Sequence, residues 1–461
     1  MILCLAACSS SSVEETKGAD VKDNHFRVGY GREDITPNTP VGLTGYGNAG
    51  ERIHKNVLDP LYLTCVATTD AEDNTVIMVV IDITGMDDSS ANTVKAKISK
   101  ATGVAKENIT VSGTHTHSAP TFESISSAII KAAEKASVAA MEDRVYADMN
   151  MGQTNTVGLN FVRHYIMNDD SVVGDNFGVA EGKQYVGHTS EADSQMQLLQ
   201  FKREGKTDVL LVNWQSHPHI TGGSDKYDLS ADIIGAFRME MEKQGEFLFA
   251  YFQGAAGNIN PTSRINSENT NQTNPRDYKM HGQYLASHAK EALADMKKLE
   301  PGLIQVRTED FVGECFHGDG ELANYAPNVL AYYAEGHTIG ETKTYAEQFG
   351  IHSLYHARAI SNRANNGATK NIPITSITMG SVGFATIPGE LFDTCGVYIK
   401  ENSPYDMTFV MGYCNGAVSY LPSKLAWSHG SYEVDIGAFV EGTAEALAER
   451  HVEILKDMKG E

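Results

Sequence analysis

The sequence has few basic side chains for its size, and it lacks any long apolar run. Its 461 residues include 37 lysines and arginines against 59 acidic side chains, so the formal net charge is −22. A chain this acidic is repelled by phosphate backbones, and no basic patch offsets the charge, which argues against a nucleic-acid partner. No stretch approaches the roughly 18 consecutive apolar residues of a membrane-spanning helix. A hydrophobic content of 41% with 21% charged residues is typical of an ordinary globular protein.

Cysteine is also scarce, and its spacing excludes two kinds of site. Apart from two cysteines near the start, the chain has four widely scattered ones, Cys65, Cys315, Cys395 and Cys414. Without a Cys-x-x-Cys pair, the sequence indicates neither a structural zinc site nor a dense disulfide framework. One long-range disulfide remains compatible with the spacing.

The first residues are typical of an export signal. Residues 1–8 end in Leu-Ala-Ala-Cys, and four serines follow at 9–12. This arrangement is similar to the lipobox of a bacterial lipoprotein, with a polar linker over 9–25. Only seven residues precede Cys8, so we interpret 1–8 as a shortened signal. We expect an exported protein of the bacterial cell envelope, lipid-anchored at Cys8 on the periplasmic side or the cell surface; a frayed apolar terminus is the alternative.

The hydrophobic pattern alternates between two periods. Runs of apolar, β-branched or aromatic residues predict strands buried on both faces at 75–82, 208–214 and 247–252. Amphipathic patterns at 89–101 and 231–244 predict helices. Strands that alternate with helices predict an α/β fold, a layered domain with a mixed, largely buried β-sheet and surrounding helices.

The remaining stretches are predicted from composition. Polar segments rich in Gly and Asn at 166–190 and 261–280 indicate loops, neither of which has the character of an interdomain linker. Residues 313–370 are helical in pattern and rich in tyrosine, so they form either a lid over a site or an ordinary surface insertion. We therefore expect a single domain over 26–461.

The sharpest local feature is the sequence Thr-His-Thr-His-Ser at 114–118, directly after a strand-like run. If His115 and His117 continue that strand, both imidazoles point to one face. Two histidines on one face can share a metal, or one can ligate while the other transfers protons. A lone His-x-His is weak evidence for either.

Three more segments follow buried runs, at the strand ends where α/β folds build their sites. They contain His217 in Ser-His-Pro-His, the glycine-rich stretch 254–261, and Glu390 in Pro-Gly-Glu. The histidine can ligate a metal, backbone amides near the glycines can face a substrate oxygen, and the carboxylate can ligate or act as a base. Each also has a plain structural interpretation: a capping histidine, a tight turn and a solvated helix start.

Together these motifs resemble the neutral/alkaline (non-lysosomal) ceramidase family, in order, from about residue 27 to 450. The further matching stretches are Gly-Arg-Glu-Asp-Ile-Thr-Pro at 31–37, Gly-Tyr-Gly at 45–47, Asn-Phe-Val-Arg at 160–163, Gln-Met-Gln-Leu-Leu at 195–199, Leu-Ser-Ala-Asp at 229–232 and the tyrosine-rich segment 415–433. The resemblance implies the family's catalytic domain.

The resemblance also implies one Zn²⁺ per chain. The matching ligands are His115, His217, Glu390 and Tyr420. A set of nitrogen and oxygen ligands suits zinc and leaves a position for water, whose pKa zinc lowers to about 7. His117 is then the candidate for passing a proton to the leaving amine.

The remaining implied roles concern the substrate. Arg163 and Tyr432 match family residues that orient the substrate or stabilise the oxyanion. The expected substrate-binding groups of the glycine-rich stretch are Gly257, Asn258 and Asn260. In well-studied members this stretch resembles Gly-Asp-Val-Ser-Pro, whereas residues 257–261 read Gly-Asn-Ile-Asn-Pro. Because an amide is no nucleophile, a serine-based role fails at Asn260, but a metal and water mechanism survives.

The family's ceramidases carry a further β-sandwich domain, which the resemblance does not reach in this sequence. We therefore expect a zinc-dependent amidohydrolase that cleaves the N-acyl linkage of ceramide, a related N-acyl lipid or a smaller N-acyl amide. The alternatives are a zinc esterase or other hydrolase on the same scaffold, and a non-catalytic lipoprotein that binds a lipid or glycan. A lipid anchor would have to hold this acidic protein at a membrane, and the sequence does not determine the oligomeric state.

Overall fold

The computed structural model describes residues 25–46, 49–175, 182–223, 226–265 and 276–461. The predicted signal over 1–8 and almost all of the linker over 9–25 lie outside these residues. Among the described helices, none is both long and apolar enough to cross a membrane.

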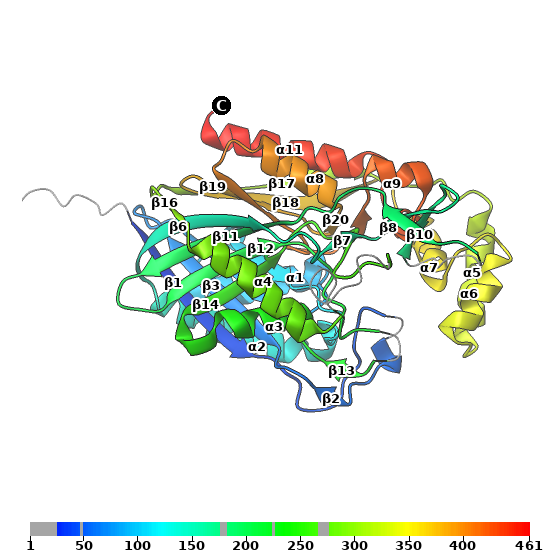
Figure 1. Ribbon diagram of the computed structural model, residues 1–461, viewed down its shortest axis with the longest axis horizontal. Coiled ribbons are helices and arrows are strands. Elements are labelled where there is room, and N and C mark those ends of the chain that lie inside the picture. The colour runs from blue at the N-terminus through cyan, green and yellow to red at the C-terminus, as the bar shows by residue number, and fades with distance from the viewer. Residues whose placement is uncertain (1–24, 47–48, 176–181, 224–225, 266–275) are drawn as a thin grey trace, which may run out of the picture.

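The centre of the fold is a mixed nine-stranded sheet (Figure 1). Its strands, in spatial order, are β14 (Phe247–Gln253), β12 (Asp208–Trp214), β11 (Gln195–Arg203), β6 (Val145–Asn155), β1 (Phe26–Asp34), β3 (Tyr62–Thr69), β4 (Thr75–Ile81) and β5 (Ile109–Gly113), with the short β16 (Lys297–Leu299) beside β6. The pairs β4 with β5 and β12 with β14 are parallel, and the other neighbours are antiparallel. All three strands predicted from apolar runs are in this sheet.

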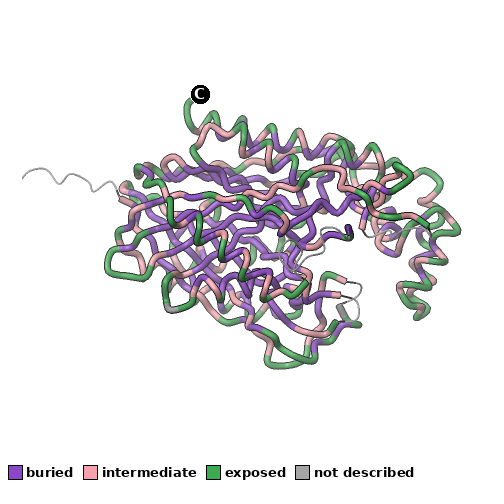
Figure 2. Tube along the Cα trace, viewed as in Figure 1, coloured by how far each residue is buried: buried purple, intermediate pink, exposed green. Residues whose placement is uncertain are grey.

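A second sheet packs on the first. Its strands are β17 (Ile304–Glu314), β18 (Thr369–Met379), β19 (Val382–Thr386) and β21 (Met407–Met411), and β19 and β21 are parallel. An apolar core between the sheets contains Phe201 and Phe252 from the large sheet and Phe384 and Phe409 from the small one. Both sheets are therefore covered on their inner faces, as Figure 2 shows by the buried colour of their strands.

Helices cover the outer faces. On the large sheet these are α1 (Asp88–Thr102), α2 (Ser126–Glu142), α3 (Asp232–Met241) and α4 (Tyr278–Leu293), and on the small sheet α8 (Asp393–Asn402) and α11 (Thr443–Lys459). Local signals set their ends: the Asp87 carboxylate accepts the Ser90 N–H at 2.7 Å before α1, and Gly103 ends it with φ 79°. The predicted layered α/β domain with a mixed, largely buried sheet is confirmed.

The structure changes one prediction made from composition and decides one question that the sequence left open. The stretch 166–190, expected to be a loop, contains parts of a three-stranded sheet formed by β8 (His164–Met167), β9 (Val172–Gly174) and β10 (Tyr185–His188). Its polar residues obscured these strands because only a small apolar cluster around Tyr165 and Met167 supports them. The four scattered cysteines are all free and buried, so none forms a disulfide.

The helical stretch within 313–370 is an insertion between β17 and β18. It consists of α5 (Leu322–Ala334), α6 (Ile339–Glu347) and α7 (Leu354–Arg363), which project at the right of Figure 1. Its helices have an apolar core of their own, built around Val329, Ile351 and Ile360. The insertion extends beside the end of the sheets where several parallel strands terminate.

Short elements complete the connections. They are the strand pairs β2 (Asn56–Val57) with β13 (Asp228–Leu229), β7 (Phe161–Val162) with β15 (Ile259–Asn260) and β20 (Glu390–Leu391) with β22 (Tyr420–Leu421), and the helices α9 (Lys424–His429) and α10 (Tyr432–Ile436). Backbone bonds join the segments after the parallel strands, for example from Gly254 N–H to Trp214 O at 2.8 Å and from Gly412 N–H to Gln253 O at 2.8 Å. The predicted site segments thus meet at one edge.

Candidate active site

A cavity of about 730 Å³ opens where these segments meet. Its floor is formed by residues that follow β5, β14 and β19, and the insertion supplies a wall through α6 and the start of α7. Among the residues predicted from sequence, those that line it are His115, His117, Arg163, Asn260, Glu390, Tyr420 and Tyr432. His217 lies directly behind them and is completely buried.

His115 and His217 are held in the same tautomer. Each donates its Nδ1 hydrogen to a backbone carbonyl, His115 to Thr84 O at 2.7 Å and His217 to Ile259 O at 2.9 Å. The Nε2 atoms therefore carry the lone pairs, which is the usual arrangement of metal-ligating histidines. Burial lowers the pKa of His115 to about 3 and that of His217 well below its usual value, so both rings are neutral at pH 7.

Glu390 faces both of these lone pairs. Its Oε2 atom lies 3.7 Å from His115 Nε2 and 3.4 Å from His217 Nε2. Ligand atoms on a tetrahedral zinc ion are separated by roughly 3.3 Å, given metal–ligand bonds of about 2.0–2.1 Å. The three atoms thus fit one metal ion. Tyr420 pairs with Glu390 in the register of β20 and β22, so it enters the site beside the carboxylate.

His117 lies next to the same point but differs from the other two histidines. Its Nε2 is 3.1 Å from His115 Nε2, while its buried Nδ1 has no hydrogen-bond partner. Burial, followed by the neighbouring His115, lowers its pKa well below the usual value. Because no carbonyl fixes its tautomer, the ring can carry a hydrogen on either nitrogen, which suits proton transfer.

His115 and His117 were expected to continue the preceding strand, and the structure shows that they do not. The strand β5 ends at Gly113, and His115 has a positive φ of 68°, so the alternation of strand side chains does not extend through them. The turn is fixed by contacts with β4 and the residues after it, from Thr114 N–H to Ile81 O and from His115 N–H to Ile83 O, both 2.9 Å. Their rings nevertheless lie next to each other in an edge-on contact, with centroids 4.8 Å apart.

Arg163 is the central cation of the site. It is buried, and its Nε donates to Glu433 Oε1 at 2.6 Å while Nη2 donates to Tyr420 Oη at 3.1 Å. The other Glu433 oxygen contacts His164 Nε2 at 2.9 Å. Although burial alone would raise it, Arg163 and His164 hold the pKa of Glu433 below its ordinary range. These bonds fix the guanidinium, whose remaining nitrogen, Nη1, lies 3.4 Å from His217 Nε2 beside the cavity that Arg163 lines.

Tyr432 forms the boundary between the floor and the insertion. Its ring contacts Tyr420 edge-on at 5.9 Å and Tyr355 of α7 at 6.3 Å between centroids. Burial raises its pKa above the usual value, so the phenol stays protonated and can donate a hydrogen bond across the working pH range.

Of the three residues of the glycine-rich stretch that were expected to bind substrate, Asn260 is the one that lines the cavity. Its Oδ1 accepts from His219 Nε2 at 3.0 Å and its Nδ2 donates to Asp175 at 2.9 Å. Gly257 and Asn258 do not line it. A Cβ on Gly257 would lie 2.4 Å from the backbone oxygen of Glu390, so this glycine permits close approach of the segment that carries the carboxylate.

Asn258 pairs with the residue that begins α8. Its Nδ2 donates to Asp393 Oδ1 at 2.8 Å, and Asp393 N–H donates to Asn258 Oδ1 at 3.0 Å. The structure therefore places Gly257 and Asn258 where they position Glu390. Neither residue lines the cavity in which a substrate would bind.

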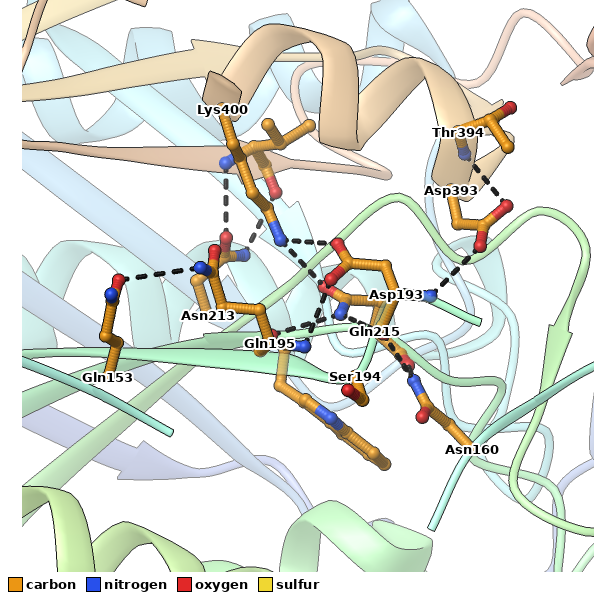
Figure 3. A network of polar contacts seen from close by, with 12 residues as sticks. Gln153, Asn160, Asp193, Ser194, Gln195, Asn213, Gln215, Asp393, Thr394 and Lys400 are labelled. Carbon is orange, nitrogen blue, oxygen red and sulfur yellow. Dashed lines mark hydrogen bonds and ion pairs between the residues drawn. The ribbon is translucent and has the colours of Figure 1, made fainter. Parts of the chain in front are cut away.

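Asp393 of this pair belongs to a polar network, which Figure 3 shows without Asn258. Asp393 accepts the backbone N–H of Asp193 at 3.1 Å, and Lys400 donates to Asp193 Oδ2 at 2.6 Å. Asn160 donates to the carbonyls of Asp193 and Gln215 at 2.8 and 2.9 Å. The network links α8, which follows Glu390, to the segment that precedes His217.

Sequence reasoning missed Tyr413. Its hydroxyl donates to Glu390 Oε2 at 3.1 Å, and its ring stacks on His115 with centroids 3.7 Å apart. It lies two residues after the end of β21 and has a positive φ of 53°. Its position shortly after a buried strand was the sequence signal that could have marked it as a site residue. Glu433 and His219 were missed as well, although each neighbours a residue that was singled out.

The family model for the N-terminal part of neutral/alkaline non-lysosomal ceramidases matches residues 26–296. The chain belongs to this family. Solved structures of ceramidases share the fold: the neutral ceramidase from Pseudomonas aeruginosa has a TM-score of 0.72 at 16% identity, covering 95% of this chain and 75% of that chain. A ceramidase complexed with C2 has a TM-score of 0.70 at 15% identity, covering 95% and 76%.

The resemblance to the neutral/alkaline ceramidase family, expected from the sequence motifs, is thereby confirmed. Three of the four predicted metal ligands, His115, His217 and Glu390, bring their ligand atoms together, and the fourth, Tyr420, lies beside Glu390 with its hydroxyl bonded to Arg163. Two residues missed from sequence also reach this centre: His219 touches the ring of His117, and Tyr413 bonds Glu390.

Proposed function

We propose that the protein is a zinc-dependent hydrolase that cleaves the amide linkage of ceramide or a related N-acyl lipid. Membership of the ceramidase family supports hydrolysis of an amide, and a ceramidase of the same fold is known as a complex with C2. The observation that carries the proposal is the convergence of two tautomer-fixed histidine Nε2 atoms, of His115 and His217, on one carboxylate oxygen of Glu390.

His115, His217 and Glu390 would hold the metal, with Tyr420 as the fourth protein ligand. This set of two nitrogens and two oxygens fits zinc. Zinc, when bound, supplies Lewis acidity and a water nucleophile at neutral pH. Nothing in this arrangement requires a nucleophilic side chain. The Asn260 amide, which is hydrogen-bonded to His219 and Asp175, forms part of the cavity wall.

The chain's other residues act on the substrate. His117, with an unpartnered Nδ1 and an Nε2 at the centre of the site, accepts a proton as water attacks and delivers it to the leaving amine nitrogen. Arg163, locked by Glu433, and Tyr432 at the cavity wall donate hydrogen bonds to the developing oxyanion of the acyl group. Both donors keep their hydrogens at neutral pH.

The test uses full-length protein stripped with a chelator and reloaded with zinc. Hydrolysis of N-acylsphingosine is followed by mass spectrometry of the released acid, and bound zinc by elemental analysis. We expect one zinc per chain, and loss of both zinc and activity in His115→Ala and Glu390→Ala. A matched ester substrate separates amidase from esterase. Activity that persists after complete metal removal would refute the proposal.

We also propose that Cys8 carries a lipid anchor at the bacterial cell envelope, on the basis of the Leu-Ala-Ala-Cys sequence that precedes the serines. Expression with a complete bacterial lipoprotein signal, with Cys8→Ser as the control, tests it. Equal partition of both forms into the membrane fraction would contradict the anchor.

A further inference from the structure

A second group of side chains that can ligate a metal lies outside the active-site centre. Two groups of three histidines or carboxylates in the described part of the chain have ligand atoms within 4.8 Å of one another. One is the histidine centre of the active site, and the other is His352, His356 and Asp435. His352 and His356 come from the N-terminal end of α7, and Asp435 comes from α10. The second group therefore lies where the helical insertion meets α10.

The three ligand atoms are close to the spacing that a metal ion requires. Asp435 Oδ2 lies 2.5 Å from His352 Nδ1 and 3.8 Å from His356 Nδ1. These distances lie on either side of the roughly 3.3 Å that separates ligand atoms around a tetrahedral zinc ion. Because the His352 side chain is 53% exposed, its ring can make the small movement that brings all three atoms onto one ion.

Without a metal ion, the same atoms form hydrogen bonds that a metal can replace. His352 donates its Nδ1 hydrogen to Asp435, and His356 Nδ1 accepts the backbone N–H of His352 at 3.3 Å. The second contact is longer than the roughly 3.0 Å that is usual for an N–H donor. A divalent cation that binds here displaces the hydrogen between His352 and Asp435, so one proton is released as the metal takes its place.

The backbone around these side chains is fixed by other contacts. Ser353 caps α7 by accepting the His356 N–H at 3.1 Å. Arg363, at the far end of α7, donates to the backbone carbonyl of Asp435 at 2.7 Å, and its guanidinium is held by the carboxylate of Asp319. The two segments that carry the ligands are thus held together before a metal arrives, which lowers the entropic cost of binding.

The group has a buried side and an open side. The side chains of His356 and Asp435 are only 6% and 15% exposed, whereas His352 lines the large cavity. A metal ion can therefore enter past His352. The open side leaves room for water molecules, which complete the coordination of an ion that has only three protein ligands.

We propose that His352, His356 and Asp435 form a second metal site, for a borderline divalent cation such as Zn²⁺, that clamps α7 of the insertion to α10. Two imidazoles and a carboxylate suit zinc, whereas Mg²⁺ and Ca²⁺ prefer oxygen ligands. Tyr355 and Tyr432, which neighbour the ligands on the two helices, contact each other with ring centroids 6.3 Å apart and line the cavity. The clamp would thus fix part of the cavity wall, and it does not depend on the proposed hydrolysis.

The test is a calorimetric titration of the full chain with zinc chloride at about pH 8, where few protons compete for the imidazoles. Gel filtration in metal-free buffer first removes loosely bound metal, so that the protein starts with the active-site zinc alone. Because the second site has three protein ligands, one of them half exposed, we expect one further zinc per chain with a Kd of about 1–10 μM. Absence of this second binding event would overturn the proposal.

Variants locate the event. His352→Gln and Asp435→Asn are each expected to weaken the second binding event at least tenfold, because loss even of a group that only orients a metal ligand costs about that much. His288→Gln is the matched control: His288 pairs with the carboxylate of Glu291 at 3.3 Å on α4 and belongs to neither group of three ligands. Unchanged zinc binding in both His352→Gln and Asp435→Asn would overturn the assignment.

Two more measurements test independence and the clamp. His115→Ala, which removes a proposed ligand of the active-site metal, should retain the second event, and its loss there would overturn a separate site. Zinc at ten times its Kd should slow hydrogen–deuterium exchange about tenfold in peptides that span α7 and α10 of the unaltered protein, but not of His352→Gln. Zinc binding without slower exchange in these helices would overturn the clamp.

Discussion

Tyr413→Phe is the substitution that most directly tests how the site holds a metal. The tyrosine hydroxyl donates to the Glu390 oxygen that faces both His115 and His217, while its ring stacks on His115 at an interplanar angle of 25°. Phenylalanine retains the ring and its stacking, so only the hydrogen bond to Glu390 is lost. Tyr413 itself is buried.

The magnitude follows from the charge of the acceptor. A hydrogen bond to an ionised group contributes about 1.5–3 kcal/mol, and loss of a partner that orients a metal ligand typically weakens metal binding about 10- to 100-fold. We expect Tyr413→Phe to weaken zinc binding within that range. At saturating zinc, kcat should change much less than the affinity does, because the hydroxyl is not placed on the substrate.

The assay is competition for zinc against a chromophoric chelator, with kcat measured in excess zinc. Tyr30→Phe is the matched control: its hydroxyl donates to Phe249 O at 3.0 Å within the large sheet, far from the site in the fold. It removes a buried tyrosine hydroxyl without touching Glu390. Unchanged zinc affinity in Tyr413→Phe together with a large fall in kcat would refute the reasoning and place the hydroxyl on the reacting groups.

Three further outcomes are expected. His117→Ala should retain one zinc per chain while kcat falls about 10²- to 10⁴-fold; loss of zinc would make His117 a ligand instead. Glu433→Gln leaves the buried Arg163 without its counter-charge and should lower the free energy of unfolding in urea by about 3–5 kcal/mol, and a loss near zero would contradict the importance of this pair. The hydrogen bond that His352 donates to the Asp435 carboxylate raises the pKa of His352, so its contribution to stability is present at low pH and is lost as pH rises through the raised pKa. Asp435→Asn should therefore lower Tm more at about pH 5.5 than at about pH 8.5, and equal losses would exclude this linkage.

The sequence predicted those parts of the fold whose signals are local. The strands expected at 208–214 and 247–252 occur at Asp208–Trp214 and Phe247–Gln253, because short uninterrupted runs of apolar, β-branched and aromatic residues are typical of strands covered on both faces. The helix expected at 231–244 is shorter, Asp232–Met241. The small sheet around Tyr165 was missed because its segments are short and polar, and only their pairing with one another makes them strands.

The candidate site was found from motifs, but the arrangement of its residues depends on contacts between distant segments. The turn at His115 is set by β4, which no pattern within Thr-His-Thr-His indicates. Glu433 binds Arg163 across 270 positions, so neither residue reveals the other. Asn258, expected at the substrate, pairs instead with Asp393, 135 positions away. Spacing in the sequence carries no information about such pairings.

The helical insertion leaves and rejoins the small sheet at two paired residues, Glu314 of β17 and Thr369 of β18. Because its own apolar core holds α5, α6 and α7 together, its sequence and length can change while the ends of the hairpin stay in register. The residues that would bind the active-site metal and move protons all come from outside it. Substrate preference can therefore diverge between relatives without alteration of the chemistry, and exchange of residues 315–368 between them is a direct way to transfer a preference.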